Sequence, residues 1–197
     1  MAFISKKASA LVSGGSSNTG GYLSASKLGD GDSMRIAIVS PEPLEFFTVW
    51  GENEEGGQKR PFRFVSEPSP SDIIAELGEF KQRMNYEGTE LEKPKFAISM
   101  FVFDYQDEKI KVLEIGQKTL IKELDKISQT EDYENLHEWD FTISRTGTKM
   151  ATEYKILPGP RKKGFTPKIQ QAWEDAIEAG YDIQQLLVGG SPFGESK

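Results

Sequence analysis

The stretch WDFTISRTGT at residues 139–148, followed by EYKILP at residues 153–158, decides the fold predicted for this chain. Apolar and polar residues alternate in both stretches, as in a strand with one buried face. Trp139, Phe141 and Ile143 share one face, which we expect to point inward. Gly147 lies in the segment between the two stretches, so the pair predicts a β-hairpin.

More strands are predicted upstream of this hairpin from their content of β-branched and aromatic residues. They lie at residues 34–40, 44–50, 60–65, 95–105 and 109–115. Helices are predicted at residues 71–80, 118–127 and 167–177 from helical spacing and helix-start residues. This order predicts a mainly β protein, an OB-like small β-barrel with short inserted helices and a C-terminal helical appendage. A split α+β sheet is the alternative.

The chain of 197 residues has a length that suits one domain with appendages. Residues 13–33 are rich in Gly and Ser and poor in apolar residues, which predicts a flexible N-terminal arm over residues 1–33. The OB-like domain is then expected at residues 34–163, and a C-terminal helical segment and tail at residues 164–197.

The composition argues against several kinds of site. Cysteine is absent and His137 is the single histidine, so a zinc site is not expected, and we predict no metal or other cofactor. The absence of cysteine favours a reducing compartment such as the cytoplasm. No stretch resembles a signal peptide or a membrane span, so we expect a soluble protein.

The formal net charge is −7, but the charges are unevenly distributed. Between Asp140 and Lys163 there are six basic residues and only two acidic ones. Because contacts within about 10 Å decide electrostatic binding at ordinary salt, a protein of negative net charge can still present a basic face to phosphates. This segment therefore predicts such a face.

Aromatic residues gather on the strand at residues 95–105. Phe101, Phe103 and Tyr105 share the face opposite Ile98 and Met100. Such a face either stacks on nucleic-acid bases or lies under another layer of the protein, such as a helix, and both arrangements fit the sequence. Upstream, Trp50 ends a strand, and Arg63 alternates with aromatic residues, which adds a second candidate for base and phosphate contacts.

The predicted hairpin resembles the one found in single-stranded DNA-binding proteins of tailed phages and related elements. The matching positions are Trp139, Asp140, Phe141, Ile143, Arg145, Gly147, Tyr154, Ile156 and Pro158. The stretches FVFDY at residues 101–105, KVLE at residues 111–114 and PFRF at residues 61–64 are also similar to elements of those proteins. The resemblance covers residues 34–158 and implies an OB-fold that binds single strands without base chemistry. The chain departs from the pattern of those proteins in two ways. It lacks the zinc ligands that some of them have, and it lacks the acidic tail that ends many of them.

We therefore expect a protein that is not an enzyme and that coats single-stranded DNA during replication or recombination, largely independently of sequence. The expected DNA-binding residues are Trp50, Arg63, Phe101, Phe103, Tyr105, Arg145, Lys149, Lys155 and Arg161. Replication or recombination proteins are further candidate partners, a homo-oligomer is compatible with the sequence, and no membrane partner is expected. One alternative is a protein-interaction or structural module, and a less favoured one is a metal-dependent nuclease that would use Asp104, Asp107 and Glu108.

Overall fold

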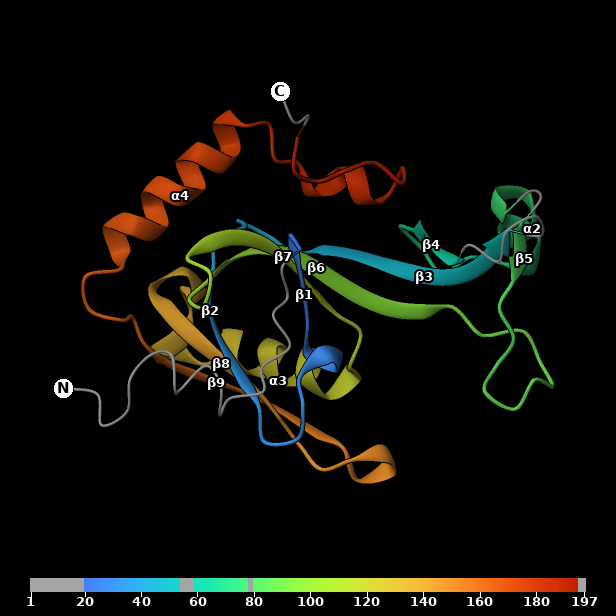
Figure 1. Ribbon diagram of the computed structural model, residues 1–197, viewed down its shortest axis with the longest axis horizontal. Helices are drawn as coiled ribbons and strands as arrows, with labels where there is room; N and C mark the ends of the chain where they lie inside the picture. The colour runs from blue at the N-terminus through green and yellow to red at the C-terminus, as the bar shows by residue number, and fades with distance from the viewer. Residues whose placement is uncertain (1–19, 54–58, 78–79, 195–197) are drawn as a thin grey trace.

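The computed structural model describes residues 20–53, 59–77 and 80–194 (Figure 1). Within these ranges the chain is mainly β, with nine strands in one mixed sheet and three α-helices. The strands are β1 (Tyr22–Ser24), β2 (Ser33–Ile38), β3 (Leu44–Asn53), β4 (Lys59–Phe64), β5 (Phe80–Gln82), β6 (Lys95–Asp104), β7 (Lys109–Ile115), β8 (Trp139–Thr146) and β9 (Glu153–Pro160). The helices are α2 (Pro70–Leu77), α3 (Lys118–Ser128) and α4 (Thr166–Glu178), with single 3₁₀ turns η1 (Ala25–Lys27), η2 (Glu131–Tyr133), η3 (Leu136–Glu138), η4 (Lys149–Ala151) and η5 (Ile183–Leu186).

The strands follow the order β1-β7-β6-β2-β8-β9. Both β2 and β3 pair antiparallel with the same edge of β6, β2 with its C-terminal part and β3 with its N-terminal part. The backbone N–H groups of Val39 and Ser40 both donate to the carbonyl of Phe101, which marks a bulge between β2 and β3. Among the described strands β9 pairs only with β8, and the outer edge of β7 pairs with β1. Hydrogen bonding therefore leaves the sheet open, and the predicted barrel closure is not seen.

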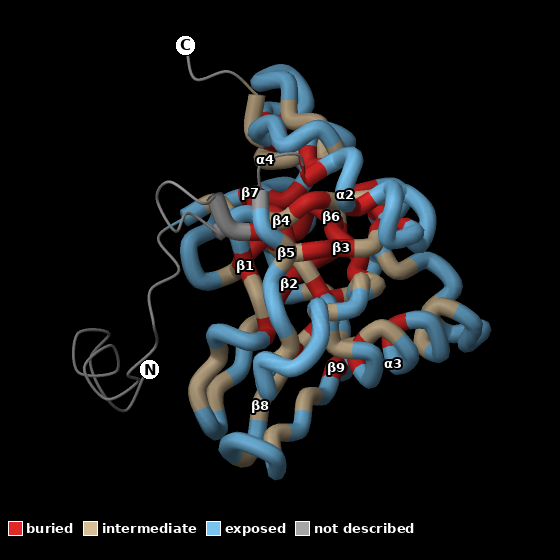
Figure 2. Tube along the Cα trace, turned by 90° about the vertical axis from the view of Figure 1, so that its right-hand side faces the viewer, coloured by how far each residue is buried: buried red, intermediate tan, exposed pale blue. Residues whose placement is uncertain are grey.

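The two faces of the sheet are each covered by a helix (Figure 1). On one face, Ile98, Met100 and Val102 pack with Leu120 and Leu124 of α3. On the other face, α4 and the segment that follows it lie over β6 and β7, and Figure 2 shows the buried residues concentrated in the sheet between these layers. The strand β6 is consequently buried on both sides over most of its length.

Most predicted elements are confirmed, with shifts of a few residues at their ends. The hairpin of β8 and β9 turns at Gly147, whose φ of +78° suits glycine, and an added Cβ would lie 2.1 Å from the carbonyl oxygen of Ala151. The expected inward face is also present, because Phe141 and Ile143 are fully buried and Trp139 is partly buried. Within the described part of the chain no helix is both long and apolar enough to cross a membrane.

The N-terminal part of the chain differs from the prediction. Tyr22–Ser24 forms β1 parallel to β7, and Leu23 and Ala25 are buried in the core that α3 covers. Residues 22–27 therefore belong to the folded domain, which corrects the predicted flexible arm at residues 1–33 over this part of its length. Its first nineteen residues lie outside the described ranges.

Candidate nucleic-acid interface

The aromatic face of β6 is closed by the C-terminal segment. Phe101 and Phe103 are only 2% and 1% exposed. The ring centroids of Trp173 and Tyr181 lie 5.5 and 5.6 Å from that of Phe101, and Phe165 lies 6.2 Å from Phe103. The prediction that Phe101 and Phe103 form an open stacking surface is therefore wrong for this structure, because these rings form a second hydrophobic core beneath α4.

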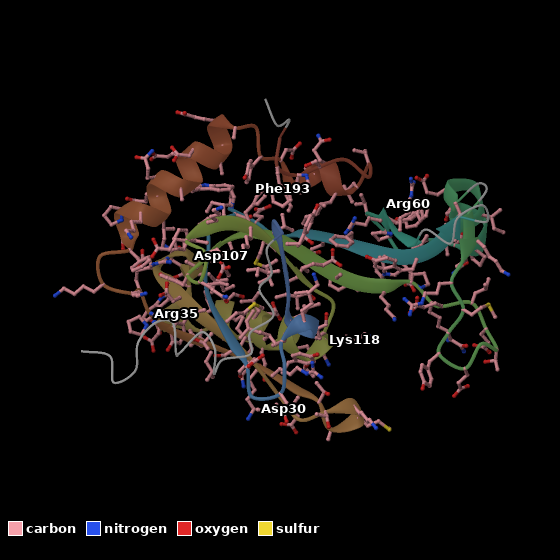
Figure 3. All side chains as sticks on the ribbon, viewed as in Figure 1. Asp30, Arg35, Arg60, Asp107, Lys118 and Phe193 are labelled. Carbon is pink, nitrogen blue, oxygen red and sulfur yellow. The ribbon has the colours of Figure 1, made fainter. Side chains whose placement is uncertain are left out.

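Tyr105 ends this aromatic row and remains partly exposed. Its ring lies 5.0 Å from that of Phe165. The Arg35 guanidinium and the Lys162 ammonium lie 5.3 and 5.5 Å from the Tyr105 ring centroid, within cation–π range. Aromatic and basic side chains are thus interleaved at this end of the sheet, near the Arg35 label in Figure 3.

The buried carboxylate of Asp140 organises these groups. Its Oδ1 accepts hydrogen bonds from the Tyr105 hydroxyl at 2.7 Å and from the Arg161 guanidinium at 2.9 Å. Its Oδ2 accepts from Arg35 Nε at 2.8 Å and from the backbone N–H of Lys162 at 3.0 Å. We call these five residues the Asp140 network. It brings together Tyr105 and Arg161, two of the predicted DNA-binding residues.

The network also changes the acidity of the tyrosine. Burial raises the pKa of Tyr105 to about 12, and the hydrogen bond that its hydroxyl donates to Asp140 acts in the same direction. The neutral phenol is therefore the form present at any physiological pH.

The loop of the β8–β9 hairpin is partly occupied by the chain itself. The Arg145 guanidinium donates to the carbonyl of Leu28 at 2.5 Å, and the Gly147 N–H donates to the Asp30 carboxylate at 2.7 Å. Arg145, one of the predicted DNA-binding residues, and the Gly147 N–H are therefore engaged by the segment before β2. Arg145 fixes that segment to the hairpin, whereas Lys149 at the tip is exposed.

Arg63 is also held within the protein. Its guanidinium pairs with Glu114 at 2.9 Å, lies 5.2 Å from the centre of the Phe46 ring, and is 11% exposed. The structure therefore gives Arg63 a packing role between β4 and β7. Trp50 is partly exposed on β3, opposite Pro61 of β4, and is not part of the Asp140 network; Figure 1 shows β4 and β5 beside β3 at one end of the sheet.

Five cations follow one another from the hairpin tip along β9 and into the linker before α4. They are Lys149, Lys155, Arg161, Lys162 and Lys163, and we call them the basic track. Strand β9 has eight residues and therefore spans about 26 Å at 3.3 Å per residue. No carboxylate of the described residues lies within ion-pairing distance of the four lysines, whereas Arg161 pairs with Asp140.

Sequence reasoning found most of this track but missed several of its neighbours. The excess of basic residues between Asp140 and Lys163 marks this segment in the sequence. Arg35 and Phe165, by contrast, carry no distinguishing pattern in the sequence. They are placed beside Tyr105 only by the fold.

The carboxylates proposed for a nuclease are all paired with lysines. Lys111 contacts both Asp104, at 2.8 Å, and Asp107, and Glu108 pairs with Lys168 at 3.0 Å. Burial lowers the pKa of Lys111, but the hydrogen bonds to Asp104 and Asp107 outweigh that effect and leave it raised. In the described ranges no three His, Asp or Glu side chains gather closely enough to hold a metal ion.

The chain shares sequence similarity with one curated phage protein. Over 131 residues it is 30% identical to a protein of Escherichia phage T5 named "Probable ssDNA-binding protein". The match covers 62% of this chain and 50% of the phage protein, so the chain spans about half the length of that relative. No protein-family model matches the chain, and no solved structure matches it.

Proposed function

We propose that this protein binds single-stranded DNA along the basic track, largely independently of sequence and without catalysing a reaction on it. The observation that carries the proposal is the row of four lysines that find no carboxylate among the described residues, in a chain whose net charge is −7. Carboxylates are abundant elsewhere in the chain. Glu153 and Glu138 lie beside the track but form no ion pair with its lysines, and a row of cations without ion-pair partners suits a polyanionic ligand.

The choice of single-stranded DNA among polyanions rests on two further supports. The name of the phage T5 relative is the first. The second is the partly exposed pair of rings, Tyr105 and Phe165, beside the end of the track. Unpaired bases offer flat faces to such rings, whereas the bases of a duplex are already stacked. Coating of DNA during replication or recombination is the biological role that this activity would serve.

The contacts predict a definite dependence on salt. If all five cations of the track neutralise phosphates, the logarithm of the affinity falls with the logarithm of salt concentration with a slope of about −3.5, since each phosphate contact on a single strand contributes about −0.7. Equilibrium titration of fluorescein-labelled oligo-dT between about 50 and about 200 mM salt measures this slope.

A pair of matched variants tests where the strand binds. In Lys155→Ala/Lys163→Ala two contacts of the track are removed, and we expect weaker binding with a slope reduced by about 1.4. In the control, Lys81→Ala/Lys93→Ala, two exposed lysines of β5 and of the segment between β5 and β6 are removed, and we expect the slope of the wild type. Equal slopes in the two variants would show that the strand does not follow the track.

The same titration tests the function itself. Absence of oligo-dT binding at low salt would overturn the proposal and favour the protein-interaction module. Equal affinity for duplex and single-stranded DNA would overturn the single-strand preference. Magnesium-dependent cleavage of labelled DNA would overturn the assignment as a binding protein without catalytic activity.

A further inference from the structure

A pocket of about 360 Å³ lies where the basic track meets α4. Its residues come from the end of β2 and the bulge after it, from η3, from the linker before α4 and from one face of α4. They include Ile38, Val39, His137, Arg161, Gln170 and Trp173. The volume falls at the small end of the range for pockets that bind small organic molecules.

The walls of this pocket are suited to a flat ring. Trp173 is partly exposed, and its other side packs on the buried ring of Phe101 at 5.5 Å between centroids. The indole is therefore already held in place, so a second ring can stack on it with little loss of side-chain entropy. Ile38 and Val39 add aliphatic surface to the lining.

The remaining walls carry polar groups suited to the edge of a base. The Arg161 guanidinium bonds to Asp140 at 2.9 Å and to the carbonyl of His137, and it still has further N–H donors. Gln170 is exposed and offers both an amide donor and an acceptor. Glu138 adds one carboxylate to the lining, which can accept from the amino group of a base but repels a phosphate.

We infer that this pocket takes one nucleobase of the bound single strand, stacked on Trp173, while the adjoining cations of the basic track hold the phosphates on either side. The inference rests on the proposed function and adds a defined base site to it. Continuity with the track identifies the ligand, because Arg161 belongs to both the track and the pocket. The strand would therefore gain base contacts at α4 although the aromatic face of β6 is closed.

The experiment compares an oligo-dT with an oligonucleotide of equal length built from abasic sites, which keeps the phosphates and removes the bases. We expect wild-type protein to bind the abasic strand more weakly. Trp173→Leu should weaken oligo-dT binding by roughly 5- to 150-fold, the range for one stacked base, and leave abasic binding unchanged. Gln170→Ala should weaken oligo-dT binding by roughly 2- to 10-fold, and its neighbour Gln171→Ala should have no effect.

Because Trp173 also packs on Phe101, a direct measurement on an intact pocket accompanies the variants. The double substitution Trp50→Phe/Trp139→Phe leaves Trp173 as the one tryptophan, and we expect its emission to be quenched by oligo-dT but not by the abasic strand. If oligo-dT binds but neither quenches Trp173 nor distinguishes Gln170→Ala from Gln171→Ala, the base site is refuted and the proposed function stands. If oligo-dT does not bind at all, the proposed function fails and the base site fails with it.

Discussion

Removal of the Asp140 carboxylate is the perturbation whose energetic effect the structure defines best. Asp140 is 2% exposed and accepts four hydrogen bonds from four different residues. In Asp140→Ala the Arg161 guanidinium, itself 15% exposed, loses its carboxylate partner, and the Tyr105 hydroxyl loses its acceptor. Breaking a buried ion pair in this way typically costs about 3–5 kcal/mol of unfolding free energy.

A conservative substitution separates charge from hydrogen bonding. The side-chain oxygen of Asp140→Asn can still accept from Tyr105 and Arg161, but its amide group would face the N–H donors of Arg35 and Lys162. Arg35 is 40% exposed, so water can replace its lost partner. We therefore expect a smaller loss for Asn, about 1–3 kcal/mol.

Urea unfolding followed by tryptophan fluorescence measures both losses. With an m-value of about 2 kcal/mol/M, the midpoint should fall by roughly 1.5–2.5 M for Asp140→Ala. The exposed neighbour Glu138→Ala serves as the control and should stay within about 0.5 kcal/mol of the wild type. A loss below about 1 kcal/mol for Asp140→Ala, or an equal loss in all three variants, would refute the reasoning that this carboxylate holds the network together.

Three further outcomes follow from the packing. Phe103→Ala should lower the unfolding free energy by about 3–5 kcal/mol and leave the oligo-dT affinity of the folded protein unchanged; weaker binding without loss of stability would mean that this ring contacts DNA. Leu23→Ala should cost about 2–5 kcal/mol by urea unfolding, and a negligible loss would show that β1 contributes nothing to the core. Tyr105→Phe should cost about 1 kcal/mol at neutral pH. Because the pKa of Tyr105 is raised from 10.0 to about 12, its contribution is complete below pH 10 and is lost as the pH rises toward 12. The difference in unfolding free energy between wild type and Tyr105→Phe should therefore be smaller at about pH 11 than at neutral pH. An equal difference at both pH values would contradict this role of the Tyr105 hydroxyl.

The predictable part of the fold is the part with strong local periodicity. The strand at residues 109–115 and the helix beginning at Lys118 are both confirmed, because the strand is rich in β-branched and other apolar residues and the helix repeats its apolar residues at helical spacing. Strand β1 has only three residues, in a stretch rich in Gly and Ser, and it exists because it pairs with β7 about ninety residues later. Local patterns carry no information about such a pairing.

The accessibility of the predicted DNA-binding residues also depends on contacts between residues that are far apart in the sequence. An aromatic face such as that of Phe101 fits an exposed stacking surface and a buried second core equally well. Arg63 and Arg145 are as basic in sequence as Lys155, but their partners lie 51 and 117 residues away. Only the three-dimensional arrangement distinguishes cations that hold the protein together from cations that are available to a ligand.

The covering of the β6 face by residues 165–193 has a consequence for how the protein is made. Translation proceeds from the N-terminus, so Phe101 and Phe103 are synthesised well before Trp173 and the residues that follow α4. About ninety residues separate Phe103 from Phe193, and at about 5–20 residues per second the ribosome needs roughly 5–18 s to add them. During that interval the nascent sheet exposes a row of aromatic rings to the cell. A chain that still lacks α4 and the residues after it therefore exposes apolar surface of the kind that makes folding intermediates prone to aggregation.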